Sequence, residues 1–335
     1  MILVTGGTGL VGSHLLLQLL QEGSAVAAIY RTESSLEAVK KVFSYYSTQH
    51  DILFNKVRWV QAELNDLLAL EKAFEKVSLV YHCAAMISFD PADFKKLRKV
   101  NAEGTANIVN LCLAHKIKKL CHVSSVATIG AAPGKAASED NYEPNSNANV
   151  YALSKYAAEM EVWRGTQEGL PVVIINPGVI MGPGSWNSGS GNFFTLAAGG
   201  MRHYPPGGTG FVGVKDVVSC MLLLMRSQIC NERFILVERN MRFKEVLDFL
   251  SVEFRQPAPK IRLRNWQLGL LWRLDWVISQ FLNRNRRLTR NSAISLKEFQ
   301  RYSNQKIENA LGFKFGSLDD DMAFSCEKYS MEREG

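Results

Sequence analysis

Residues 149–161, NVYALSKYAAEME, place a tyrosine and a lysine four positions apart in a segment that reads as the opening of a helix. Residues four apart on a helix lie one turn above each other, so Tyr151 and Lys155 would share one surface. An ammonium beside a phenol favours the phenolate and lowers a pKa that is otherwise about 10. Such a pair could move protons, but a lysine stem lying along a half-buried tyrosine gives the same pattern.

A glycine-rich segment near the N-terminus has the spacing of a phosphate-binding loop. VTGGTGLVGSH places Gly6, Gly9 and Gly12 three residues apart, between an apolar run and an amphipathic segment. A pyrophosphate binds where the backbone can approach it closely and where the N–H groups of a helix N-terminus point at it. Side chains at these glycines would block that approach. A plain tight turn is the alternative, but this context favours a dinucleotide site. The residues expected to form it are Gly6, Thr8, Gly9, Leu10, Val11 and Gly12.

The end of the second apolar run distinguishes the two nicotinamide cofactors. An acidic residue there would accept from the adenosine ribose 2'-hydroxyl, whereas a cation would pair with a 2'-phosphate. The sequence AAIYRTESS has Arg31 at this point, so we expect NADP to be preferred, with NAD as the alternative because Glu33 lies close by. Further cofactor contacts are expected from residues after later strands, namely Glu63, Leu64, Ala84, Ala85, Pro177 and Val179.

Short apolar runs alternate with amphipathic segments over the first half of the chain. The runs are β-branched or aromatic, as in strands buried on both faces of a parallel sheet. They cover 2–5, 26–30, 57–62, 79–85, 119–125 and 172–178. Apolar residues at helical spacing fill 13–22, 66–74, 102–116 and 151–168. The alternation predicts an α/β fold with a doubly wound parallel sheet.

The sequence changes in character after Pro177. Segments 181–194 and 204–211 are rich in glycine, serine and proline and predict loops. We expect helices over 216–227 and 243–254 and a strand over 233–237. The predicted division is a cofactor-binding domain, 1–178 with about 208–237, and a smaller, mostly helical substrate-binding region, 179–207 with 238–330.

Composition narrows the class of protein. The 335 residues are 47% hydrophobic, as in ordinary globular chains. Six cysteines occur without CxxC pairs, and no basic segment precedes the first apolar run, so we expect a cytoplasmic protein without metal site or disulfide framework. The net charge of +7 is concentrated in 231–303, which holds 15 Lys and Arg against 7 Asp and Glu. A solvated basic surface is favoured over a specific anionic partner, and no nucleic acid is expected.

The stretch 265–282, NWQLGLLWRLDWVISQFL, has an apolar stripe that includes Trp266, Leu270 and Leu274. Arg273 and Asp275 interrupt it, so it does not predict a membrane span. Three interpretations stay open: a helix packed on the domain, a lid over an apolar substrate, or peripheral membrane contact through 265–290. The last would be supported by Arg284, Arg286, Arg287 and Arg290.

Six motifs then occur together in one order. They are TGGTGLVG, HCAA, VNAEGT, HVSSVATIG, YALSK and NPGVIMGPG. With these motifs in this order, the chain resembles the extended short-chain dehydrogenase/reductases, also called the NAD(P)-dependent epimerase/dehydratase family. Its segment 302–313 is similar to the closing segment of the dihydroflavonol reductase and 3β-hydroxysteroid dehydrogenase branch. The resemblance implies a Rossmann-type fold, an NAD(P) cofactor and a homodimer paired through the helices that start near Asn101 and Tyr151.

Hydride transfer to a carbonyl carbon requires a proton on the oxygen, which assigns a role to each polar residue of these motifs. Tyr151 would supply the proton, Lys155 would tune it and hold the nicotinamide ribose, and Ser125 would hydrogen-bond the substrate oxygen. Strand alternation turns Ser124 to the opposite face. The resemblance implies that Asn101 positions the lysine through backbone and water. The expected substrate residues are Met86, Phe89, Ser125, Tyr151, Trp186 and Phe193.

Departures from the family pattern restrict the reaction. Val126 and Ala127 replace the Asp-Glu pair that sugar-nucleotide dehydratases need, so dehydration is not expected, and Asn176 replaces a common arginine. We therefore expect an NAD(P)H-dependent oxidoreductase that interconverts a ketone or aldehyde with an alcohol on a partly apolar small molecule. The alternatives are a nucleotide-sugar epimerase with retained NAD, against which Arg31 argues, and a catalytically silent cofactor-binding or membrane-associated scaffold.

Overall fold

The computed structural model describes residues 1–130, 134–141, 143–145, 147–282, 286 and 288–334. Its centre is one seven-stranded sheet in which every neighbouring pair is parallel. Across the sheet the strands follow in the order β10 (Glu232–Leu236), β6 (Val172–Pro177), β5 (Lys119–Val123), β4 (Leu79–His82), β1 (Ile2–Thr5), β2 (Val26–Tyr30) and β3 (Arg58–Gln61). The chain order reverses between β1 and β4, so the predicted doubly wound, Rossmann-type sheet is confirmed.

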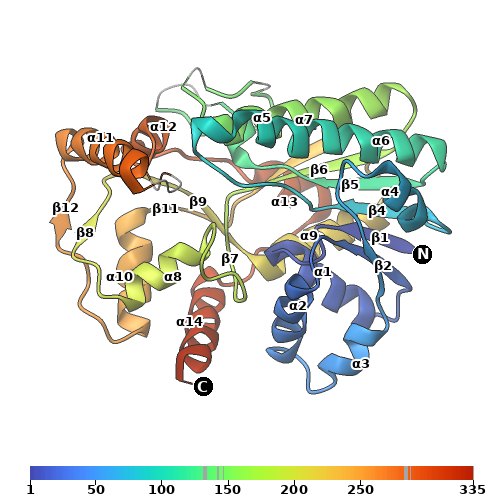
Figure 1. The fold of residues 1–335 in the computed structure, drawn as a ribbon, viewed down its shortest axis with the longest axis horizontal. Coiled ribbons are helices and arrows are strands. Elements are labelled where there is room, and N and C mark those ends of the chain that lie inside the picture. Colours follow the sequence, from blue (N-terminus) through green and yellow to red (C-terminus); the bar gives the residue numbers. More distant parts are fainter. Residues whose placement is uncertain (131–133, 142, 146, 283–285, 287, 335) are drawn as a thin grey trace.

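Helices cover both faces of this sheet (Figure 1). One face carries α1 (Leu10–Gln21), α2 (Ser34–Ser44), α3 (His50–Asn55) and α9 (Val214–Arg226), and the other carries α4 (Leu67–Phe74), α6 (Gly104–Ala114) and α7 (Val150–Gln167). Leu16, Phe43 and Met221 lie in the core of the first face, and Leu70 and Ile108 in that of the second. Burying each such side chain stabilises the fold by about 1.5–3 kcal/mol, and the strands are apolar because both their faces are covered.

A second group of elements is built from the C-terminal part of the chain and the segment after β6. It contains a three-stranded sheet in the order β11 (Arg239–Arg242), β9 (Gly208–Gly213) and β7 (Val179–Met181), and a pair of β12 (Ile261–Arg262) with β8 (His203–Tyr204). Its helices are α8 (Gly191–Ala198), α10 (Phe243–Glu253), α11 (Asn265–Leu282), α12 (Arg290–Ser295) and α14 (Leu318–Glu334). A separate core that includes Phe194, Phe211 and Met322 holds several of them together.

Short or irregular helices complete the chain. They are a 3₁₀ turn at Pro91–Asp93, α5 (Phe94–Leu97), a π-helix at Arg98–Glu103, a 3₁₀ turn at Val126–Thr128 and α13 (Gln305–Leu311). No described helix is long and apolar enough to cross a membrane.

Two of the predicted loops are partly regular structure. Segment 181–194 includes the end of β7 and the start of α8, and segment 204–211 includes the first four of the six residues of β9. The glycines of β9 serve close packing, because a Cβ at Gly208 would lie 2.4 Å from the Met241 carbonyl oxygen and one at Gly210 would lie 2.6 Å from Val237. Glycine inside a strand marks such close approach as readily as a turn, so the loop prediction was wrong there.

Candidate active site

The glycine loop lies at the reversal point of the sheet, between β1 and α1. Gly6 has a positive φ of 68°, and a Cβ added there would lie 2.6 Å from the Ala84 amide nitrogen. A Cβ at Gly12 would lie 2.1 Å from the Gly6 carbonyl oxygen, and Gly9 donates to that same oxygen at 3.0 Å. No side chain caps the N-terminus of α1, whose first turn has no acidic residue. A bare helix N-terminus reached by backbone alone fits the pyrophosphate of a dinucleotide.

The remaining residues predicted to contact the cofactor follow the neighbouring strands. Arg31 is exposed directly after β2, and among the described residues its side chain forms no ion pair. Leu64 is buried against Gly104, where a Cβ would lie 2.7 Å from the leucine, whereas Glu63 is exposed. Four further residues lie at strand ends on the same edge of the sheet or beside it: Ala84 and Ala85 after β4, Pro177 at the end of β6, and Val179 at the start of β7.

The helix α7 brings Tyr151 to Ser125. Asn149 caps α7 by accepting a hydrogen bond from the Ala152 amide at 2.9 Å, which fixes the turn that carries the tyrosine. Ser125 follows β5 and caps the 3₁₀ turn Val126–Thr128. The Ser125 hydroxyl lies near enough to the Tyr151 phenol to lower the pKa of the phenol. The two hydroxyls predicted to face a carbonyl oxygen are therefore neighbours.

Lys155 lies one helical turn after Tyr151 and is almost fully buried. Its Nζ donates to the Val123 carbonyl oxygen at 2.8 Å, at the end of the strand that leads to Ser125. Burial lowers the pKa of Lys155 to about 8, and the negative charge of Glu159 opposes this. Its ammonium is thus held at the carboxyl end of β5.

Burial raises the pKa of Tyr151 to about 12, and the nearby Ser125 hydroxyl opposes the shift. We expected Lys155 to lower this pKa; in the protein alone burial raises it, and the group that opposes the rise is Ser125. A phenol with a raised pKa stays protonated at neutral pH, which suits a proton donor better than a base.

Asn101 connects the segment after β4 to α7. It lies in the π-helix Arg98–Glu103, where its Oδ1 accepts from the Met86 amide at 2.7 Å and its Nδ2 donates to the Met86 carbonyl at 3.0 Å. Nδ2 also donates to the Ser154 hydroxyl at 2.9 Å, next to Lys155. Single π-helical turns inside helices often occur at functional sites. These hydrogen bonds of Asn101 fix the position of Met86 relative to α7.

A buried polar network behind Ser125 was not predicted from the sequence. Glu159 is fully buried, its Oε1 accepts from Arg233 at 2.9 Å, and its Oε2 accepts from Ser124 at 2.6 Å. Oε2 also accepts from Thr128 and Asn176, each at 3.0 Å, so the unusual Asn176 is part of this network. The signal in the sequence is that Glu159 follows Lys155 by one more helical turn.

The alternation that separates Ser124 from Ser125 is present in the structure. Ser124 is buried and donates to Glu159, whereas Ser125 is half-buried and reaches Tyr151. Ser124 therefore belongs to the supporting network and Ser125 to the candidate site.

The predicted substrate residues fall into two groups. Phe89 packs edge-on to the Tyr151 ring, with ring centroids 5.6 Å apart, and Met86 is held by Asn101. Trp186 instead contacts Phe194 and Tyr329 and donates to Glu332, and Phe193 packs on Phe211 and Phe243. Both lie at the third core, whereas Phe89 is in ring contact with Tyr151 and Met86 is tied through Asn101 to Ser154 on α7.

Comparisons with known proteins agree with this geometry. A model of the NAD dependent epimerase/dehydratase family matches residues 2–235. Sterol demethylase protein B of Methylococcus capsulatus is 28% identical over 267 residues, which cover 78% of this chain and 76% of that protein. A putative dihydroflavonol 4-reductase of Synechocystis is 29% identical over 273 residues, which cover 78% of this chain and 75% of that protein. The crystal structure of gox2253 has a TM-score of 0.80 and 25% identity over 99% of this chain and 98% of that one.

The fold and the glycine loop define a dinucleotide-binding enzyme, and the matched model extends over most of the chain. The chain belongs to the NAD dependent epimerase/dehydratase family, as its six motifs predicted. It is an NAD(P)-dependent oxidoreductase of the short-chain dehydrogenase/reductase type.

Proposed function

We propose that the protein reduces a ketone or aldehyde on a partly apolar small molecule to the alcohol. The observation that carries this proposal is that Ser125 lies beside a half-buried, protonated Tyr151, one helical turn before the buried Lys155. A bound NADPH supplies the hydride for such a reduction. Every other task falls to side chains of this chain.

In the proposed reaction Ser125 and Tyr151 both hydrogen-bond the carbonyl oxygen. Negative charge develops on that oxygen during the reduction, and the oxygen then takes the proton of the Tyr151 phenol. The Lys155 ammonium stabilises the resulting phenolate and holds the ribose hydroxyls next to the nicotinamide. Phe89 and Met86 cover the reacting carbon and keep water from it.

We further propose that NADP is preferred over NAD. Arg31 is exposed after β2, where it can pair with a 2'-phosphate. Arg31→Asp removes that cation and supplies an acceptor for a 2'-hydroxyl, so we expect the ratio of NADPH to NADH affinity to fall by at least about tenfold. Titration of both variants with each cofactor measures this ratio. Exposed Lys56→Asp is the control, and an unchanged ratio in Arg31→Asp contradicts the preference.

The main rival is a nucleotide-sugar epimerase. Such an enzyme keeps its cofactor through turnover, so it would purify with NAD bound in a stoichiometric amount. A reductase releases its cofactor and consumes NADPH when offered a ketone. We expect protein free of NAD that oxidises NADPH with at least one member of a panel containing a sterol ketone and a dihydroflavonol. Stoichiometric NAD together with no NADPH consumption favours the epimerase, and cofactor binding with neither activity favours a silent scaffold.

Three further properties are proposals of the same kind. A homodimer paired through α6 and α7 rests on the family resemblance, because Ala152 and Ala158 of α7 are buried within the protomer and Ala157 is half-buried. A cytoplasmic location is consistent with the six cysteines, which are free thiols in the structure. Peripheral membrane contact through 265–290 is the third of these properties. Two of the arginines predicted to support it, Arg284 and Arg287, lie outside the described residues.

A further inference from the structure

The helix α11 exposes a continuous apolar side. Trp266 is 63% exposed, Leu270 and Leu274 are each 47% exposed, and Ile278 is 43% exposed. These residues recur every four positions and so lie along one side of the helix, while Leu268 faces the protein and is buried. Contiguous exposed apolar surface of this kind marks an interaction site.

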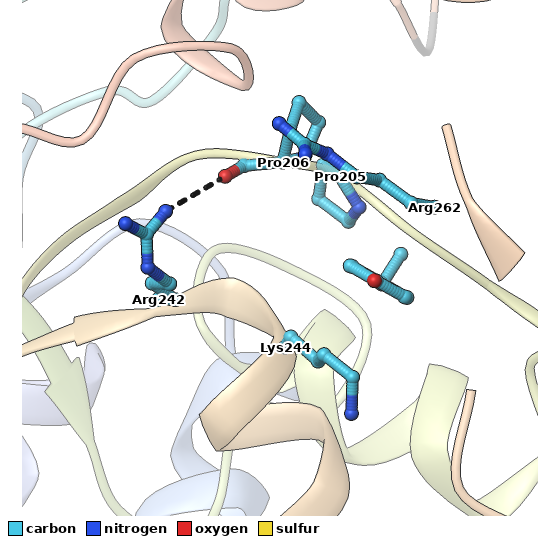
Figure 2. Close-up of a pocket in the computed structure, with 6 residues that line it drawn as sticks. Pro205, Pro206, Arg242, Lys244 and Arg262 are labelled. Carbon is cyan, nitrogen blue, oxygen red and sulfur yellow. Dashed lines mark hydrogen bonds between the residues drawn. The ribbon is translucent and has the colours of Figure 1, made fainter. Parts of the chain in front are cut away.

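A basic cavity lies beside the start of α11. It has a volume of about 350 Å³ and is lined by Tyr204, Pro205, Pro206, Arg242, Lys244 and Arg262 (Figure 2). Its three cations come from the end of β11, from α10 and from β12, the strand that leads into α11. A second hollow of about 500 Å³, lined by residues 262–265, continues from Arg262 to the first residue of the helix.

The charge of this cavity is not neutralised by the side chains around it. Lys244 pairs with Asp248, but among the described residues Arg242 and Arg262 form no ion pair. Arg242 is held in place by the Pro206 carbonyl oxygen at 3.5 Å and by the Phe299 ring at 5.0 Å. Residues 255–290 contain nine Lys and Arg against a single Asp.

We propose that this end of the molecule docks on a membrane that contains anionic phospholipids. The cavity of Arg242, Lys244 and Arg262 binds a lipid phosphate, and the apolar side of α11 enters the interface between headgroups and acyl chains. Tryptophan and leucine on one side of a helix, with arginine around it, is the arrangement that such interfaces favour. A second copy of this chain would bring the same positive surface against itself, so an anionic partner fits better.

The segment that follows α11 lies next to the candidate active site. The Arg286 amide donates to Asp90 at 3.3 Å, one residue after Phe89, and Asn291 donates to the Ala148 carbonyl at 3.4 Å, shortly before Tyr151. If the proposed reductase function holds, an apolar substrate would reach Tyr151 directly from the lipid phase. The docking itself does not depend on that function.

The test measures sedimentation of the full chain with vesicles of phosphatidylcholine, with and without phosphatidylglycerol. We expect binding only to the anionic vesicles and a decrease with salt. Arg242→Gln/Arg262→Gln should weaken it by about fivefold for each charge removed. The triple change of Trp266, Leu270 and Leu274 to serine should abolish it. Wild-type tryptophan fluorescence should be quenched by lipids brominated in the acyl chains.

Matched controls are Lys56→Gln/Lys118→Gln and Leu68→Ser, at exposed positions elsewhere on the surface. They should bind vesicles as the wild type does. If Arg242→Gln fails to fold, judged by circular dichroism, the exposed Arg262→Gln alone should still weaken binding about fivefold. No vesicle binding by the wild type, equal loss in the controls, or binding of inorganic phosphate without binding of vesicles overturns the proposal. If the protein binds vesicles but does not oxidise NADPH, the proposed reductase function is wrong and the docking proposal stands.

Discussion

Replacing Glu159 with glutamine tests whether the buried network supports the candidate site. Five donors converge on this carboxylate: Arg233 and Trp163 on Oε1, and Ser124, Thr128 and Asn176 on Oε2. A glutamine amide retains one oxygen, so its NH₂ group faces the donors Arg233 and Trp163 in one orientation and the Asn176 amide in the other. The Arg233 guanidinium would also lose its counter-charge while it stays buried.

Removing one partner of a buried ion pair costs about 3–5 kcal/mol of unfolding free energy. Arg233 also donates to the carbonyl oxygens of Glu139 and Asn141, so we expect a loss near the lower end of that range. Urea unfolding followed by circular dichroism at pH 7 measures it. Glu161→Gln is the matched control, because Glu161 lies on the same helix and pairs with the partly exposed Arg164, a pair worth at most about 0.5 kcal/mol. A Glu159→Gln protein whose unfolding free energy lies within about 1 kcal/mol of the wild type, the size of one helix cap, would refute the reasoning.

Two further predictions concern the lysine and the glycine loop. Burial lowers the pKa of Lys155 to about 8 while Tyr151 stays protonated, so kcat/KM for NADPH should fall above about pH 8. Lys155→Arg should remove that fall. A fall at the same pH in Lys155→Arg contradicts the assignment. The same shift means that unfolding free energy rises between about pH 8 and pH 10.5, since the unfolded chain binds the proton more tightly there. Gly12→Ala places a Cβ 2.1 Å from the Gly6 carbonyl oxygen, so it should lower both the melting temperature and the affinity for NADPH. In Gly9→Ala the new Cβ lies 3.4 Å from that same oxygen, so this change should lower the affinity alone. Equal affinity of Gly9→Ala and wild type, by fluorescence titration, would show that the loop does not hold the phosphates.

The sequence allowed the sheet and the glycine loop to be predicted because both depend on local patterns. Strands buried on two faces are continuous apolar runs, and a pyrophosphate loop needs glycine at fixed intervals. The start of β9 was missed because Gly208 and Gly210 serve contacts with Met241 and Val237, residues distant in sequence.

The candidate site divides in the same way. The spacing of Tyr151 and Lys155 is local, so it could be read from one helix. The pairing of Glu159 with Arg233 joins α7 to β10, 74 positions apart, and only the folded chain brings them together. The raised pKa of Tyr151 is likewise a consequence of burial, which local spacing does not give. Trp186 and Phe193 were assigned to the substrate from composition alone, and their ring contacts lie in the third core.

The central claim is that Tyr151 donates the proton during reduction. The most direct measurement is a single turnover of NADPH oxidation by Tyr151→Phe, with the ketone that the wild type reduces fastest, alongside fluorescence titration of NADPH binding. Removing a general acid costs about 10²–10⁴ in rate. The account predicts a loss of that size with NADPH affinity unchanged within about twofold, that is, about 0.4 kcal/mol. Turnover by Tyr151→Phe at the wild-type rate would contradict it.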